Sequence, residues 1–98
     1  MSFDFETDGE GFLRNRDEWT PEIAAEIAKR DGRELTEEHM TYIMAARKMY
    51  NDDGIVPVLR KFTKAMNVDK KVLFDSFQTG PIKLICKWGG LPKPTGCV

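Results

Sequence analysis

The sequence predicts a mainly α-helical domain: a small orthogonal bundle of about five helices with a short N-terminal β-hairpin and an extended C-terminal arm. Helix start and stop signals recur between residues 20 and 88, and the apolar residues there follow helical spacing. Residues 89–98 contain two prolines and no helical period, so we expect a mobile arm rather than core. With 98 residues, 41% hydrophobic and 32% charged, the chain fits one globular domain over residues 1–98.

The expected hairpin occupies residues 1–13. The stretch 3–7 alternates apolar and polar side chains, as a half-buried strand does. Asp8-Gly9 is a common hairpin turn pair, after which Phe12-Leu13 would return as the second strand. Because two strands alone are marginally stable, we expect this hairpin to pack against helices.

The first two helices have recognisable ends. Thr20 is a suitable N-cap with Pro21 at the first helical position, and Gly32 is a natural stop. Thr36 caps a second helix that runs to about Tyr50. Apolar side chains cover most of this second helix, which makes it the expected central helix.

Two polar residues, His39 and Arg47, fall on the apolar part of the second helix. Buried polar side chains are generally hydrogen-bonded. For both residues we therefore favour a structural hydrogen bond across helices over a catalytic role.

Three further helices complete the predicted bundle. The third spans about residues 57–66, the fourth about residues 69–77, and the fifth begins at Gly80-Pro81 and ends at Gly89-Gly90. The third helix carries a basic stripe of Arg60, Lys61 and Lys64.

Composition excludes several classes of protein. No apolar stretch approaches the ~20 residues that a membrane span needs. No basic n-region with an apolar h-region opens the sequence, so we expect no secretion by a signal peptide. Two cysteines are too few for a disulfide-stapled secreted scaffold, and with one histidine they rarely fill a zinc site. We therefore expect a cytoplasmic protein that binds no metal or cofactor of its own.

Charge is distributed unevenly along the chain. Residues 1–53 hold fourteen acidic and seven basic side chains, whereas residues 54–98 hold two acidic and eight basic ones. The basic half also contains both cysteines, and a positive potential favours thiolates and bound anions. An equally plausible interpretation is that two oppositely charged halves simply pack together.

The first cysteine, Cys86, lies in the fifth helix at the border between apolar side chains and Lys83 and Lys87. Nearby ammonium groups would favour its thiolate and so its nucleophilicity. A small buried apolar residue is nevertheless the favoured interpretation, because most lone helical cysteines serve that purpose.

The second cysteine, Cys97, is the penultimate residue of the arm. The adjacent terminal carboxylate would raise its pKa, so a reactive thiol here needs a basic surface to dock against. An extended span back to Cys86 covers roughly 36 Å at most, so the arm can fold back to form a disulfide. Together the pair suggests a carrier that accepts a cargo atom on one sulfur and releases it by thiol exchange. The candidate basic residues are Lys93, Lys83, Lys87, Arg60 and Lys64.

These residues resemble the DsrC/TusE family of sulfur-carrier proteins, which includes the gamma subunit of dissimilatory sulfite reductase. The most specific stretch is the C-terminal GLPKPTGCV, residues 90–98. The other matching positions are DGEGFL at 8–13, Trp19, LTEEH at 35–39, Arg47, Tyr50, Pro57, Arg60, TKA at 63–65, Gly80-Pro81 and Lys83.

The resemblance implies roles for both thiols. Cys97 matches the penultimate cysteine that bears sulfur in that family, and Cys86 matches the upstream cysteine of the DsrC type. Cys97 would then take up sulfur as a persulfide, and Cys86 would resolve it as a trisulfide or disulfide. The implied fold is a helical bundle with an N-terminal hairpin and a mobile arm.

The resemblance also implies partners. These are the alpha and beta subunits of the reductase with their siroheme and iron–sulfur clusters, a DsrE-type or TusD-type sulfur donor, and a membrane complex that reduces the trisulfide. Two departures are Met40, where the family usually has Trp, and a segment from Met66 to Phe77 that is several residues shorter. The second departure puts in doubt any partner contact made through the missing loop.

Two alternatives stay open. One is a TusE-like relay for tRNA 2-thiouridine synthesis, which would use Cys97 alone. The other is a helical DNA-binding regulator with residues 57–66 as its recognition helix, against which the pI of 5.8 and net charge of −1 argue. We therefore expect nucleic acid not to be a partner.

Overall fold

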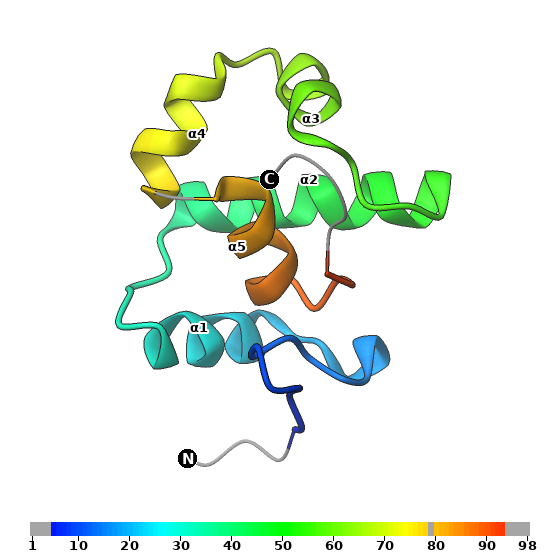
Figure 1. Cartoon of the computed structure of the whole chain (residues 1–98), viewed down its shortest axis with the longest axis vertical. Coiled ribbons are helices and arrows are strands. Elements are labelled where there is room, and N and C mark those ends of the chain that lie inside the picture. Colours follow the sequence, from blue (N-terminus) through cyan, green and yellow to red (C-terminus); the bar gives the residue numbers. More distant parts are fainter. Residues whose placement is uncertain (1–4, 79, 94–98) are drawn as a thin grey trace.

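The computed structural model describes residues 5–78 and 80–93 of the chain. Within these residues the fold is mainly helical, as predicted, and every expected helix is present (Figure 1). The elements in chain order are a 3₁₀ turn η1 (Arg16–Glu18), α1 (Pro21–Arg30), α2 (Glu37–Asp53), α3 (Leu59–Met66), α4 (Lys70–Phe77) and α5 (Pro81–Trp88).

The helix starts follow the predicted caps. The Thr20 hydroxyl accepts a hydrogen bond from the backbone N–H of Ile23 at 3.2 Å, with Pro21 at the first position of α1. Two boundaries differ from prediction. Helix α2 continues to Asp53, where the left-handed Gly54 ends it, and α3 begins only at Leu59.

The expected N-terminal hairpin is wrong within the described residues. A single antiparallel bridge joins Thr7 and Leu13, and no strand ladder forms around it. The reason is that Asp8 closes a compact loop instead of a two-residue turn: its Oδ1 accepts from the N–H groups of Glu10 and Phe12, at 2.9 and 3.0 Å. These backbone donors, that of Phe12 foremost, lower the pKa of the Asp8 carboxyl.

Helix α5 lies at the centre of the bundle, in contact with α1, α2 and α4 (Figure 1). Five of its side chains are almost completely buried: Pro81, Ile82, Ile85, Cys86 and Trp88. The sequence pattern assigned the central place to α2, but α2 keeps an exposed face and α5 is the more enclosed helix. None of the described helices is long and apolar enough to cross a membrane.

His39 is a structural residue, as predicted. Its Nδ1 accepts from the backbone N–H of Thr36, and its Nε2 lies 2.8 Å from the carbonyl oxygen of Ser76 on α4. This pairing assigns the neutral tautomer with the proton on Nε2. The ring packs against Phe77 and Trp88 at centroid distances of 4.6 and 5.4 Å. His39 thus caps α2 and ties it to α4.

Candidate functional site

Cys86 is completely enclosed in the protein. Its side chain is 0% exposed, and desolvation raises the pKa of its thiol to about 12. The favoured interpretation of a small buried residue is therefore confirmed for the described conformation. At neutral pH this thiol is protonated and unreactive. Cys97 lies outside the described residues.

The expectation of a partly shielded Cys86 beside two ammonium groups is wrong. Lys83 is exposed on the outer face of α5. The Lys87 Nζ is 2.6 Å from Asp31 Oδ1, so its charge is directed toward the end of α1. The helical wheel placed Cys86 at the border of the apolar arc, but α5 is covered on three sides and the border position is inside.

The C-terminal end of α5 is closed by a Schellman cap. The last helical bond runs from the N–H of Gly89 to the carbonyl of Ile85 at 2.8 Å, and the N–H of Leu91 makes the long Schellman bond to the carbonyl of Cys86 at 2.9 Å. Gly90 adopts a φ of 67°, in the left-handed region that glycine tolerates. The backbone of Cys86 is therefore bonded directly to the segment that follows the helix.

Residues 89–91, which we expected to begin a mobile arm, are buried. Leu91 is 3% exposed and belongs to the same buried cluster as Cys86. Of the described residues that follow α5, only Pro92 and Lys93 are not buried. Lys93 forms an ion pair with Glu10 at 2.7 Å, between side chains that are about half exposed.

Trp19 and Arg47 hold this cap in place, and we call the pair the Trp19–Arg47 clamp. The indole N–H of Trp19 donates to the carbonyl of Trp88 at 2.9 Å, and the guanidinium of Arg47 donates to the carbonyl of Gly89. Arg47 also lies over the Trp19 ring, 4.0 Å from its centroid. The predicted structural hydrogen bond of Arg47 is thus confirmed.

The clamp leaves no space for a side chain at Gly90. A Cβ atom there would lie 2.7 Å from Cδ1 of Trp19 and 2.9 Å from its Cγ. Only glycine lets the Trp19 ring lie directly against the backbone at the cap. Burial lowers the pKa of Arg47 from its ordinary value, yet the group stays protonated because that value is so high.

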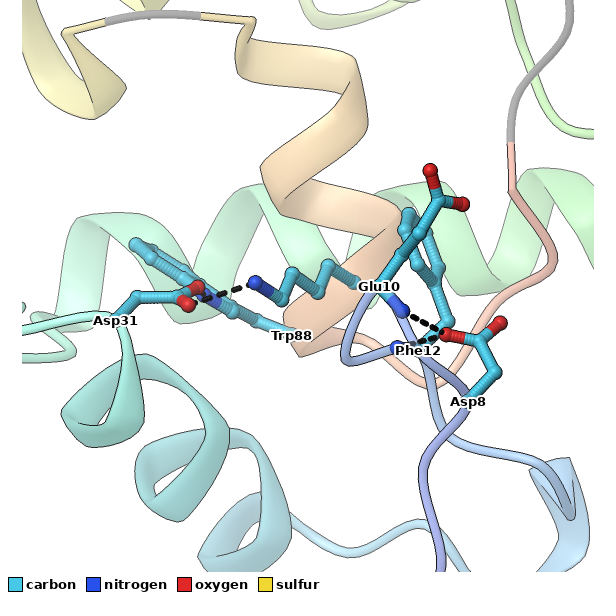
Figure 2. A network of polar contacts seen from close by, with 6 residues as sticks. Asp8, Glu10, Phe12, Asp31 and Trp88 are labelled. Atoms are coloured by element: carbon cyan, nitrogen blue, oxygen red, sulfur yellow. Dashed lines mark hydrogen bonds and ion pairs between the residues drawn. The ribbon is translucent and has the colours of Figure 1, made fainter.

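Asp31 links the end of α1 to α5. Its two carboxylate oxygens accept from Lys87 Nζ at 2.6 Å and from the indole N–H of Trp88 at 2.9 Å. Figure 2 shows this carboxylate beside Trp88, with the Asp8 loop and its partners Glu10 and Phe12 nearby. The stem of Lys87 also passes over Gly11 of that loop, where a Cβ atom would lie 2.6 Å from Lys87 Cε.

The five basic residues predicted to support the thiols do not form one site. Lys83 and Lys87 line a hollow of about 360 Å³ with Arg33, and Lys93 lines another next to Tyr50. The remaining two, Arg60 and Lys64, belong to α3. Arg60 borders a third hollow with Thr63 and Val68. Among the described residues, no cluster of His, Cys, Asp and Glu could hold a metal ion.

Sequence reasoning missed the contacts that matter most around Cys86. Trp19 and Trp88 are 69 positions apart, and Asp31 and Trp88 are 57 positions apart, so no local pattern connects them. Trp19 entered the sequence argument only as one of the family-like positions. The adjacent Gly89-Gly90 pair, which predicted only the end of the fifth helix, was a usable signal, because glycine also permits close approach by another chain segment.

A family model matches nearly the whole chain. The model described as "DsrC like protein" matches residues 2–98. This chain belongs to the DsrC-like family. The fold agrees: DsrC from Allochromatium vinosum, solved by NMR, is 41% identical with a TM-score of 0.88, and the match covers 100% of this chain and 96% of that one.

Other DsrC-like relatives fall into two named groups. The gamma subunit of dissimilatory-type sulfite reductase from Nitratidesulfovibrio vulgaris is 37% identical over 95 residues, covering 96% of this chain and 90% of that protein. The sulfurtransferase TusE from Buchnera aphidicola is also 37% identical, over 102 residues, covering 95% of this chain and 88% of that protein. A crystal structure titled dissimilatory sulfite reductase I matches with 35% identity and a TM-score of 0.82, over 96% of this chain and 91% of that one.

Proposed function

We propose that this DsrC-like protein is a sulfur carrier in which Cys97 bears the sulfur and Cys86 resolves it. The observation that carries the proposal is the pair of cysteines in a DsrC-like chain: one at the penultimate position in GLPKPTGCV and one in the last helix. Similarity over nearly the full length to a gamma subunit of dissimilatory sulfite reductase supports the same conclusion.

The chemistry uses two thiols in sequence. Cys97 accepts a sulfur atom and becomes a persulfide, R–S–SH. The Cys86 thiolate then attacks the inner sulfur, which forms the Cys86–Cys97 disulfide and releases the carried atom as hydrogen sulfide. One electron pair from an external reductant, with two protons, returns both thiols. When the carried sulfur arrives two electrons more oxidised, as R–S–SOH on Cys97, the Cys86 thiol displaces its hydroxyl group as water, and the sulfur is retained between the two cysteines as a trisulfide.

Burial of Cys86 sets the order of these steps. A protonated thiol with 0% exposure does not compete for a sulfur donor in solution, so loading falls to Cys97. Cys86 acts only after it becomes accessible to the loaded arm. Its burial therefore protects the resolving thiol from adventitious oxidation in the resting protein.

The proposed partners follow from this role. In sulfite reduction, the alpha and beta subunits of the reductase, which would supply the siroheme and iron–sulfur clusters, would load Cys97 with sulfur from sulfite, and a membrane electron-transfer complex would then reduce the trisulfide. In the opposite direction of sulfur flow, a DsrE-type or TusD-type protein would be the sulfur donor. The cytoplasmic location stays a prediction.

A persulfide-loading experiment tests the proposal. The reduced protein is treated with a persulfide donor and each cysteine is followed by peptide mass spectrometry. We expect Cys97 to gain the mass of one sulfur atom. In a separate sample without the donor, mild oxidation should link Cys86 and Cys97 with the loss of two hydrogens. The Cys97→Ser variant should gain no sulfur. Sulfur found on Cys86 alone, with Cys97 unmodified, would refute the assignment.

A relay of the TusE type is the second candidate. The inert environment of Cys86 favours it, because such a relay needs Cys97 alone, and the TusE relative is as similar as the gamma subunit. The Cys86→Ser variant separates the two: transfer from loaded Cys97 to an acceptor protein stays intact in a relay and is lost in a two-thiol carrier. No observation favours the DNA-binding alternative over these two.

A further inference from the structure

We propose that Trp19 and Arg47 are positioning residues that keep the C-terminal cap of α5 closed over Cys86, and that local opening of this cap exposes the thiol. The part of this inference that concerns sulfur transfer rests on the proposed function. The opening itself does not, because it concerns only the accessibility of one buried side chain.

The clamp fixes three consecutive residues at the end of α5. Trp19 holds the carbonyl of Trp88, Arg47 holds the carbonyl of Gly89, and the Trp19 ring lies against Gly90. The next residue, Leu91, is bonded through its N–H to the carbonyl of Cys86. The contacts thus run without interruption from the clamp to the backbone of the cysteine.

The remaining surroundings of Cys86 are much harder to move. Helix α5 packs against α1, α2 and α4 in the hydrophobic core, and separating any of these helices exposes large buried side chains such as Phe77 and Trp88. The cap is smaller: besides its own backbone bonds, two side-chain hydrogen bonds, the half-buried Trp19 ring and one buried side chain, that of Leu91, retain it. In a Schellman cap the side chain at the position of Leu91 commonly packs on the side chain at the position of Cys86, and both belong to one buried cluster. Trp19 itself lies in the non-helical link between η1 and α1. Local opening of the cap is therefore the least costly route to the thiol.

The test measures how fast Cys86 reacts when it is the only thiol. In a Cys97→Ser chain, alkylation by iodoacetamide is followed by mass spectrometry at increasing urea concentration, with unfolding followed in parallel by circular dichroism. We expect labelling at low urea to depend weakly on urea, which indicates an opening that exposes little surface. Arg47→Ala should accelerate this labelling about ten- to a hundred-fold, since a charge-assisted hydrogen bond is lost.

Matched variants separate positioning from general destabilisation. Trp19→Phe keeps a ring against Gly90 but loses the indole donor, so it should give a smaller acceleration than Trp19→Ala. Leu73→Ala removes a fully buried side chain of α4. This control should lower global stability and accelerate only the labelling that depends steeply on urea.

Two results would overturn the inference. One is labelling in the parent chain that follows global unfolding at every urea concentration. The other is a clamp variant that labels no faster than Leu73→Ala once the two are compared at equal global stability. Should Arg47→Ala fail to fold, the labelling rate of Trp19→Phe at low urea is compared with that of the parent chain, and an equal rate overturns the inference. Persulfide loading of Cys97 takes no part in this readout, so failure here leaves the proposed function standing.

Discussion

Replacement of Asp31 by alanine tests whether the α1–α5 link stabilises the fold. The Asp31 carboxylate accepts a hydrogen bond from the indole N–H of Trp88 at 2.9 Å. Because Trp88 is completely buried, Asp31→Ala would leave this N–H without a partner. A hydrogen bond to a charged group contributes about 1.5–3 kcal/mol. The ion pair with Lys87, whose side chains are 17% and 23% exposed, adds less than about 1 kcal/mol. Asp31 follows the C-terminal end of α1, where removing a negative charge returns a few tenths of a kcal/mol.

The expected loss for Asp31→Ala is therefore about 2–3 kcal/mol, which lowers the midpoint of thermal unfolding by roughly 10–20 °C in a domain of this size. Urea denaturation followed by circular dichroism measures the loss of unfolding free energy. Asp31→Asn keeps an oxygen acceptor for the indole and should lose only about 1 kcal/mol. Asp53→Ala is the matched control, since its ion pair with Lys61 joins side chains that are 40% and 53% exposed. Equal losses for Asp31→Ala and Asp53→Ala would refute the reasoning.

Three further predictions concern other buried positions. In a Cys97→Ser chain, alkylation of Cys86 through the local opening should rise about tenfold per pH unit up to about pH 9 and then level off, because the exposed thiol regains the ordinary pKa of 9.0. Since burial raises the folded pKa to about 12, the contribution of Cys86 to stability is constant below pH 9 and falls between pH 9 and about pH 12, which urea titration at each pH measures. Gly90→Ala should cost about 2 kcal/mol or more, because it clashes with Trp19 at a positive φ, whereas Gly32→Ala, with open space around it, should cost about 1 kcal/mol of unfolding free energy. His39→Ala should cost about 2–4 kcal/mol by thermal unfolding, since it loses a cap, a bond to α4 and ring packing; a loss below about 0.5 kcal/mol would contradict the structural role.

Helix positions were predictable because their signals are local. The caps at Thr20 and Thr36 and the proline at position 81 each act within one turn, and each marks the observed start of its helix. The N-terminal hairpin failed for a related reason. Asp8 and Gly9 satisfy the turn rule, but the same Asp8 side chain also captures backbone N–H groups up to Phe12, and the sequence alone does not rank these two uses.

The surroundings of Cys86 were only partly predictable. A wheel gives the direction of a side chain around its own helix but not how many neighbouring helices cover that direction. Three helices, α1, α2 and α4, pack against α5, and Cys86, at the border of its apolar face, is therefore fully buried. The Trp19–Arg47 clamp was beyond reach for a stronger reason, because it joins residues from three separate parts of the chain at the end of α5.

The closed cap reconciles the two interpretations of Cys86 that the sequence left open. A cysteine kept only for packing needs burial, and a resolving cysteine needs access, and these requirements conflict in a rigid structure. They do not conflict when access depends on a local opening, since the fraction of time spent open multiplies the reactivity of the exposed thiol. A thiol exposed by the opening regains a pKa near 9.0, so it is far more reactive at neutral pH than the buried form. In the proposed carrier, burial and resolution are successive states of one residue, and the strength of the Trp19–Arg47 clamp sets the balance between them.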